Sequence, residues 1–279
     1  MNAAPLTISD HSRDSAGLRY VYPVLSRRAG GVSIGLNLNP NNACNWRCIY
    51  CQVPGLVRGT APGLDLALLE SELQGFLQQL EHGDFMQRVP PEARRINDIA
   101  LSGNGEPTSA AEFVEVVEII ARHKPATIKL LLITNGSLMH RQNVQQGVRR
   151  LAQLNGEVWF KLDRASEAGM AQINDTRVTM DAVRRNLVTT LACCPNTWLQ
   201  TCWFALDGQA PNAQDEQDYL VFLEGLLRSG TAPRGVLLYG LARPSMQPEA
   251  PRLGALPHAH LVAFARRIEA LGLQVRIAD

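Results

Sequence analysis

Apolar runs and segments of helical periodicity alternate along most of the chain. Six runs rich in apolar and β-branched residues, each followed by a turn, predict buried strands. They occupy residues 31–39, 96–103, 127–136, 156–163, 197–208 and 234–244. Apolar residues at helical spacing between them predict helices at 65–82, 110–123, 140–153, 179–192, 214–228 and 258–271. A short strand over 273–279 is expected to follow the last helix.

This order of strand and helix indicates a parallel sheet with right-handed crossovers. Six units are fewer than the eight of a closed barrel, so the prediction is an α/β fold, a partial (β/α)6 TIM-like barrel of parallel strands with outer helices. A flat, doubly wound sheet is the alternative. In either fold the active site lies at the C-terminal ends of the strands. We expect an N-terminal extension over residues 1–30 and one barrel domain over 31–279.

Composition and charge limit the classes of partner that the protein is expected to bind. Hydrophobic residues make up 46% of the chain and charged residues 19%, as in an ordinary folded protein. The formal net charge of +1 provides no overall field that would attract nucleic acid or a membrane surface. The chain lacks both an apolar run of the roughly 20 residues that span a bilayer and the apolar core of a signal peptide. We therefore predict a cytoplasmic protein, in which thiols stay reduced.

Three of the six cysteines are crowded into one loop. Cys44, Cys48 and Cys51 lie within "CNWRCIYC", directly after the first predicted strand. Thiolates are metal ligands, and three of them can hold an iron–sulfur cluster with one iron left open to a small molecule. A zinc site with a distant fourth ligand, or plain buried cysteines, are the alternatives. The other cysteines, in "ACCPNTWLQTC", are expected to be buried small residues rather than ligands of a second cluster.

The spacing of these residues resembles a family signature. The pattern C-x-x-x-C-x-aromatic-C, formed by Cys44, Cys48, Tyr50 and Cys51, is similar to that of the radical S-adenosylmethionine (SAM) superfamily. After the second strand, "GNGEPT" resembles the family's Gly-Gly-Glu-Pro loop with one residue, Asn104, inserted. The text "YPVLSRRAGGVSIGLNLNP" before "CNWRCIYCQ" resembles a branch that groups uncharacterised bacterial iron–sulfur oxidoreductases with wyosine-tRNA synthases.

The resemblance implies a function and two cofactors. A 4Fe–4S cluster would be held by Cys44, Cys48 and Cys51, and its open iron would chelate the amino and carboxylate groups of SAM. An electron donor such as flavodoxin or ferredoxin would reduce the cluster. Cleavage of SAM would then give methionine and a 5′-deoxyadenosyl radical, which abstracts hydrogen from a substrate that the sequence does not disclose.

Further candidate site residues stand near the predicted strand ends. Glycines 103 and 105 allow peptide groups to approach the cofactor closely, and Glu106 would accept from its ammonium or orient the loop. Lys161, the catalytic candidate, would contact the cofactor carboxylate or an anionic substrate, and Asp163 a ribose hydroxyl. A structural ion pair is the alternative for these two. The residues expected to bind cofactor are Tyr50, Gly103, Asn104, Gly105, Glu106, Asn135, Asp163 and Arg243.

Other functions stay open at this stage. A closed cluster without SAM chemistry would make an electron-transfer or sensing protein, and zinc would make a binding module. A tRNA-modifying enzyme like the wyosine synthases is a further alternative. However, residues 1–43 contain no cysteine for the second cluster of the archaeal wyosine enzymes, and no basic stripe with interleaved aromatics indicates tRNA binding.

Overall fold

A curved sheet of eight strands forms the centre of the molecule, which we describe from a computed structural model covering residues 17–26, 30–241 and 243–278. The first strand pairs antiparallel with the second, and all the others pair in parallel. In sheet order the strands are β1 (Val21–Ser26), β2 (Gly31–Asn37), β5 (Ile96–Ser102), β6 (Lys129–Thr134), β7 (Glu157–Lys161), β8 (Thr197–Cys202), β10 (Gly235–Tyr239) and β12 (Gln274–Ala278).

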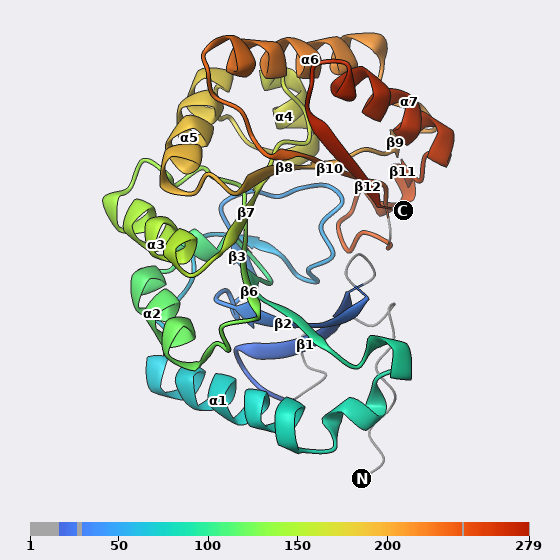
Figure 1. The fold of residues 1–279 in the computed structure, drawn as a ribbon. Coiled ribbons are helices and arrows are strands. Elements are labelled where there is room, and N and C mark those ends of the chain that lie inside the picture. Colours follow the sequence, from blue (N-terminus) through green and yellow to red (C-terminus); the bar gives the residue numbers. More distant parts are fainter. Residues whose placement is uncertain (1–16, 27–29, 242, 279) are drawn as a thin grey trace.

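Helices cover the outer face of this sheet, as Figure 1 shows. The six long ones match those expected from periodicity: α1 (Leu66–His82), α2 (Phe113–His123), α3 (Gln142–Gln153), α5 (Met180–Cys193), α6 (Ala213–Arg228) and α7 (His258–Glu269). Strands β1 and β12 are the two edges of the sheet, so the barrel does not close. Because the sheet curves and its helices lie on one face, the predicted partial barrel is confirmed over the flat, doubly wound alternative.

The two large apolar cores lie between the strands and the helices. One buried core joins the first strands to α1, α2 and α3, and a second joins the later strands to α5, α6 and α7. Because side chains alternate across a strand, the residues between those core positions face the barrel interior. On β5, for example, Ile99 and Leu101 are core residues, whereas Asp98, Ala100 and Ser102 line the interior cavity. The inner face thus carries polar and functional groups next to apolar side chains such as Leu131 and Leu237.

Several elements were not predicted. Strand β1 contains Pro23, which weakens a strand pattern and is tolerated at a sheet edge. The sheet therefore reaches into residues 21–26, which we expected in the N-terminal extension; residues 1–16 and 27–29 of that extension lie outside the described residues. Helix α4 was expected to be a loop. The remaining short elements are α4 (Glu167–Asn174), β3 (Ala43–Cys44), β4 (Val57–Arg58), β9 (Ala205–Leu206), β11 (Leu253–Gly254), η1 (Phe85–Arg88), η2 (Pro91–Ala93), η3 (Pro107–Ser109) and η4 (Ala250–Arg252).

Candidate active site

The three clustered cysteines face one cavity inside the barrel. Cys44, Cys48 and Cys51 are half-buried, and all three line a cavity of about 1090 Å³. Their thiols are free of disulfide bonds. In the part of the chain that the structure describes, no three His, Cys, Asp or Glu side chains are arranged to hold one metal ion. A four-iron cluster instead takes each cysteine on a different iron, so three thiols from one loop around an open cavity suit that group.

The surroundings of the thiols affect their protonation. Burial raises the pKa of Cys44 to about 11 and that of Cys48 to about 12, even though Lys161 and a hydrogen bond from Asn174 favour the Cys48 thiolate. That bond runs from Asn174 Nδ2 to Cys48 Sγ, at 3.2 Å. Both thiols are thus protonated at neutral pH without iron. Since thiolates are the ligand form, a metal bound by these cysteines would have to displace their protons.

Segments distant in sequence hold the cysteine loop in place. The backbone N–H of Ile49 donates to Ile173 O at 2.9 Å, and that of Arg47 donates to Asn174 O at 3.1 Å, which attaches the loop to α4. On the other side, Ser245 Oγ donates to Ile49 O at 2.7 Å, and Gln247 Nε2 donates to Val53 O at 2.9 Å. The loop is therefore a fixed wall of the cavity.

The glycine loop after β5 packs tightly against the strand that precedes the cysteines. Gly103 has φ +130°, a conformation that L side chains rarely adopt, and a Cβ there would meet Asn37 Oδ1. A Cβ at Gly105 would overlap the carbonyl oxygen of Ala43. Between the glycines, Asn104 donates from its backbone to Asn37 Oδ1 at 3.0 Å. Glycine at both positions lets the loop lie against the cysteine segment.

Glu106 is turned into the protein and orients the neighbouring loops. It is 2% exposed and burial raises its pKa, against the hydrogen bonds that it accepts. Its Oε1 accepts from the hydroxyls of Thr108 and Thr134, both at 2.6 Å, and its Oε2 accepts from the Asn135 backbone at 2.7 Å. Both carboxylate oxygens are thus occupied by the loops after β5 and β6.

Asn135 connects the loop after β6 to the cysteine loop. Its Nδ2 donates to Asn45 Oδ1 at 2.8 Å, and Asn45 Nδ2 donates to Ser137 Oγ at 2.7 Å. Asn135 Oδ1 accepts from the Ser137 backbone at 3.0 Å. The asparagine therefore makes the local turn bonds expected of such a residue and also positions the cysteine-bearing segment.

Lys161 and Asp163 lie at the end of β7 and share a network with two tyrosines. Tyr50 OH donates to Asp163 Oδ2 at 2.5 Å, and Asn174 Nδ2 donates to the same oxygen at 2.7 Å. Lys161 Nζ donates to Tyr239 OH at 3.2 Å and lies 4.0 Å from Asp163 Oδ1. Burial by itself lowers the pKa of Lys161, but the Asp163 carboxylate, together with the nearby Tyr239, Cys48 and Cys202, raises it, and the net effect holds that pKa above its usual value. Lys161 is thus a fixed cation.

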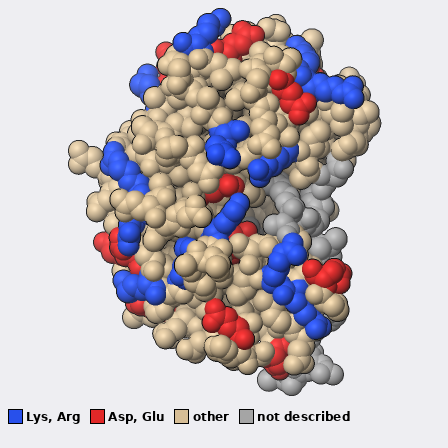
Figure 2. Space-filling model, viewed as in Figure 1, with Lys and Arg blue, Asp and Glu red and all other residues tan. Residues whose placement is uncertain are grey.

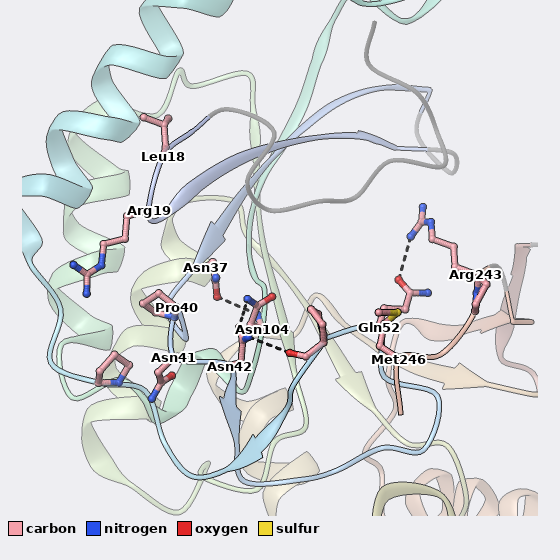
Figure 3. A pocket seen from close by; sticks show the side chains of 13 residues that line it. Leu18, Arg19, Asn37, Pro40, Asn41, Asn42, Gln52, Asn104, Arg243 and Met246 are labelled. Atoms are coloured by element: carbon pink, nitrogen blue, oxygen red, sulfur yellow. Dashed lines mark hydrogen bonds between the residues drawn. The ribbon is translucent and has the colours of Figure 1, made fainter. Parts of the chain in front are cut away.

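A second cavity borders the first at the mouth of the barrel. It measures about 830 Å³, and Gln52, Asn104 and Arg243 line both cavities. Figure 3 shows Asn104 beside Asn42, to which its amide donates at 2.6 Å, and Arg243 facing Gln52. The Arg243 Nη1 to Gln52 Oε1 distance is 3.4 Å. The two cavities therefore share one rim of amide and guanidinium groups.

The expected site residues largely come together. All of them except Asp163 line the larger cavity, and Asp163, 1% exposed, lies behind Tyr50. Cys193, Cys194 and Cys202 are buried, as predicted, and Cys202 also lines the cavity. The residues that sequence reasoning missed are Asn174, Gln200 and Tyr239. For Asn174 a signal existed, because Ser166 followed by helix-forming residues marks the start of α4.

The surface carries mixed charge. Figure 2 shows lysines and arginines spread among acidic and uncharged residues, without a basic stripe on this face. Within the described residues, none of the helices combines the length and the apolar character needed to cross a membrane.

Comparison with known proteins finds sequence relatives that match only part of this chain. No protein-family model matches the chain. A UPF0026 protein of Helicobacter pylori strain 26695 is 30% identical over 130 residues, which is 46% of this chain and 38% of that protein. The matched segment thus spans less than half of the relative's length.

Solved structures share the fold. TYW1, solved with a lysine–pyruvate adduct bound, superposes with a TM-score of 0.54 at 16% identity, over 85% of this chain and 73% of that one. Coproporphyrinogen III oxidase (HemN) of Escherichia coli, described as a radical SAM enzyme, gives a TM-score of 0.50 at 9% identity, over 85% and 50% of the chains. The chain therefore has the partial-barrel fold of radical SAM enzymes.

Proposed function

We propose that this chain is a radical SAM enzyme whose cluster is held by Cys44, Cys48 and Cys51. The observation that carries the proposal is the meeting of three thiols from one loop with the glycine loop after β5, at the mouth of a cavity of about 1090 Å³. This volume slightly exceeds the roughly 300–1,000 Å³ typical of small-molecule sites. A cavity of that size leaves room for a cofactor and a substrate beside the cysteines, which an electron-transfer protein does not need.

A 4Fe–4S cluster bound there, once reduced, would supply the electron that splits the C5′–S bond of SAM into methionine and a 5′-deoxyadenosyl radical, which takes a hydrogen atom from the substrate. The chain's own residues would position the reactants. Gly103, Asn104 and Gly105 would present backbone groups to the methionine part of SAM, because their loop borders the cysteine segment. Tyr50, beside the last two cysteines, would pack against the cofactor.

In our proposal the buried carboxylates do not touch the cofactor themselves. They position the residues and loops that do. Glu106 would hold the loops after β5 and β6, because both of its oxygens already accept hydrogen bonds. Asp163 would fix Tyr50 and Lys161 instead of binding the ribose hydroxyl that the sequence suggests, because it is buried behind Tyr50. Asn135 would hold the cysteine segment through Asn45.

At the rim, Arg243 would contact an anionic group, since its guanidinium lines both cavities. A flavodoxin or ferredoxin would supply the electron.

We also expect a cytoplasmic location, because all six cysteines are free thiols, which persist in a reducing compartment.

Anaerobic reconstitution with iron and sulfide tests the function. We expect brown protein with about four irons per chain, bleached by dithionite, that converts SAM to 5′-deoxyadenosine and methionine. Cys48→Ala should lose the cluster absorbance and all SAM cleavage. Cys193→Ala is the matched control, because Cys193 lies in α5 outside the cavity, and it should retain both. A coloured protein that cannot cleave SAM would instead indicate electron transfer, and a colourless protein with one zinc would indicate a zinc module.

A further inference from the structure

A glutamine carbonyl inside the barrel is buried without a hydrogen-bond donor. Gln200 belongs to β8, is 5% exposed and lines the same cavity as the three cysteines. Among the described residues, none donates to its Oε1 atom. Buried polar atoms are nearly always paired, and an unpaired one carries a desolvation cost that a donor on a bound molecule would remove. The carbonyl thus marks a place for a ligand's N–H or O–H.

A cationic residue stands in register with Gln200 on the neighbouring strand. Lys161 of β7 is the strand-pairing neighbour of Gln200 and lines the same cavity. An ammonium has three donors, and within the described part of the chain Lys161 Nζ uses one of them, on Tyr239 OH. Its 4.0 Å separation from Asp163 Oδ1 is too long for a hydrogen bond. Two donors therefore remain for a ligand.

The surroundings hold this cation still. Its Nζ lies 5.1 Å from the ring centroid of Tyr50 and 5.8 Å from that of Tyr239, within the range of cation–π contacts. Leu131 and Leu237 line the cavity as well, and they offer apolar surface beside the polar pair. A bound molecule would therefore meet a fixed positive charge, a carbonyl acceptor and an apolar wall.

We propose that Lys161 and Gln200 form a recognition site for a carboxylic acid that carries an N–H or O–H donor next to its carboxylate. The carboxylate would accept from Lys161 Nζ, and the donor would bond to Gln200 Oε1. The two residues stand in register on neighbouring strands, whose backbones are about 4.8 Å apart. An α-hydroxy acid, an α-amino acid or an N-acyl amino acid carries its donor close to its carboxylate, as two neighbouring side chains require. This inference rests on the proposed function, because it assigns the substrate of the same site.

Isothermal titration calorimetry of the cluster-loaded protein, saturated with SAM, tests the site. The probes are L-lactate, N-acetylglycine and propionate, and only propionate lacks the donor. We expect wild-type protein to bind lactate about tenfold more tightly than propionate, as one satisfied hydrogen bond implies. Gln200→Leu and, as a second variant of similar volume, Gln200→Met should bind the two acids equally.

Further variants complete the experiment. Lys161→Met should weaken both acids about tenfold or more, because the carboxylate loses its charged partner. The control, Gln217→Leu on the exposed face of α6, should keep the wild-type preference for lactate. A wild type without preference for the donor-bearing acids, or a Gln200→Leu variant that retains it, would overturn the site. So would lactate binding that is seen only when the titration is repeated without SAM, which would assign the pair to the cofactor.

Formation of 5′-deoxyadenosine by the wild type is measured separately. Protein that cleaves SAM but shows no lactate preference overturns only this inference. Protein that shows the preference but never cleaves SAM overturns only the proposed function.

Discussion

Buried charged and polar side chains, each with several partners, shape this site at the level of single residues. Asp163 is 1% exposed, yet its two oxygens accept from Tyr50, Asn174 and the backbone of Cys202. Lys161 stands beside it as the compensating cation. A buried charge without such partners would be strongly destabilising, so the pair can be maintained only as a unit.

Asp163→Asn should destabilise the protein because it leaves the Lys161 ammonium buried without a counter-charge. We expect the free energy of unfolding to fall by about 3 kcal/mol, measured by urea denaturation of the apo protein. Asp84→Asn, at an exposed position without a side-chain cap bond, is the control and should change it by less than about 0.5 kcal/mol. An Asp163→Asn variant as stable as the wild type would show that the pair is not stabilising.

At the scale of elements, the short helix α4 has an influence beyond its eight residues. Ser166 Oγ caps it by accepting from the Gly169 backbone at 3.2 Å, and Asp175 ends it in the left-handed conformation with φ +46°. The last residue of the helix, Asn174, thereby reaches both Cys48 Sγ and Asp163. A hydrogen bond to a ligand sulfur stabilises the reduced, more negative form of an iron–sulfur cluster.

Asn174→Ala should therefore lower the midpoint potential of the reconstituted cluster. One net hydrogen bond of about 1 kcal/mol corresponds to a shift on the order of tens of millivolts for a one-electron couple. A mediated redox titration followed by electron paramagnetic resonance measures the shift. Asn186→Ala, which removes a hydrogen bond from α5 to Ser137 O in the loop after β6, is the matched control and should leave the potential unchanged. An unchanged potential in Asn174→Ala would mean that this bond does not act on the cluster.

For the whole molecule, the open barrel depends on contacts that join its two halves around the cysteine loop. Arg47 lies in that loop and binds Glu249 through two hydrogen bonds, of 3.0 and 2.8 Å. Its Nε also donates to Asp175 at 3.0 Å. The guanidinium lowers the pKa of both carboxyl groups. Arg47 thus connects the cysteine loop, the end of α4 and the segment after β10.

Arg47→Gln should weaken this connection in a pH-dependent way. Carboxyl groups whose pKa is lowered in the folded state add stability above their unfolded pKa, and that stability is lost as the pH falls through the folded pKa. We expect the variant to be less stable by about 1 kcal/mol at neutral pH, with the difference shrinking below about pH 4. Urea denaturation of apo protein at several pH values measures it. Arg177→Gln, exposed at the surface, is the control; a difference independent of pH would refute the ionic explanation.

Local patterns in the chain specified the order of the elements and the chemistry of the cysteine loop. Periodicity identified six strands and six helices of the barrel. Each strand buries one face against helices and each helix buries one face against the sheet, so both leave a regular pattern of apolar residues. The cysteine spacing is equally local. Since parallel strands present their C-terminal ends on one side, the order of elements also predicted that Cys44, Gly103, Asn135 and Lys161 would meet.

Only the tertiary structure decided which residues hold the side chains of the site in place. The contacts of Asn174 with Cys48, of Tyr50 with Asp163 and of Arg47 with Glu249 join residues 126, 113 and 202 positions apart. No spacing rule relates such residues, because their distance depends on how strands and loops pack. The same holds for Gln200, which reads as an ordinary strand residue until the register places it beside Lys161 inside the barrel.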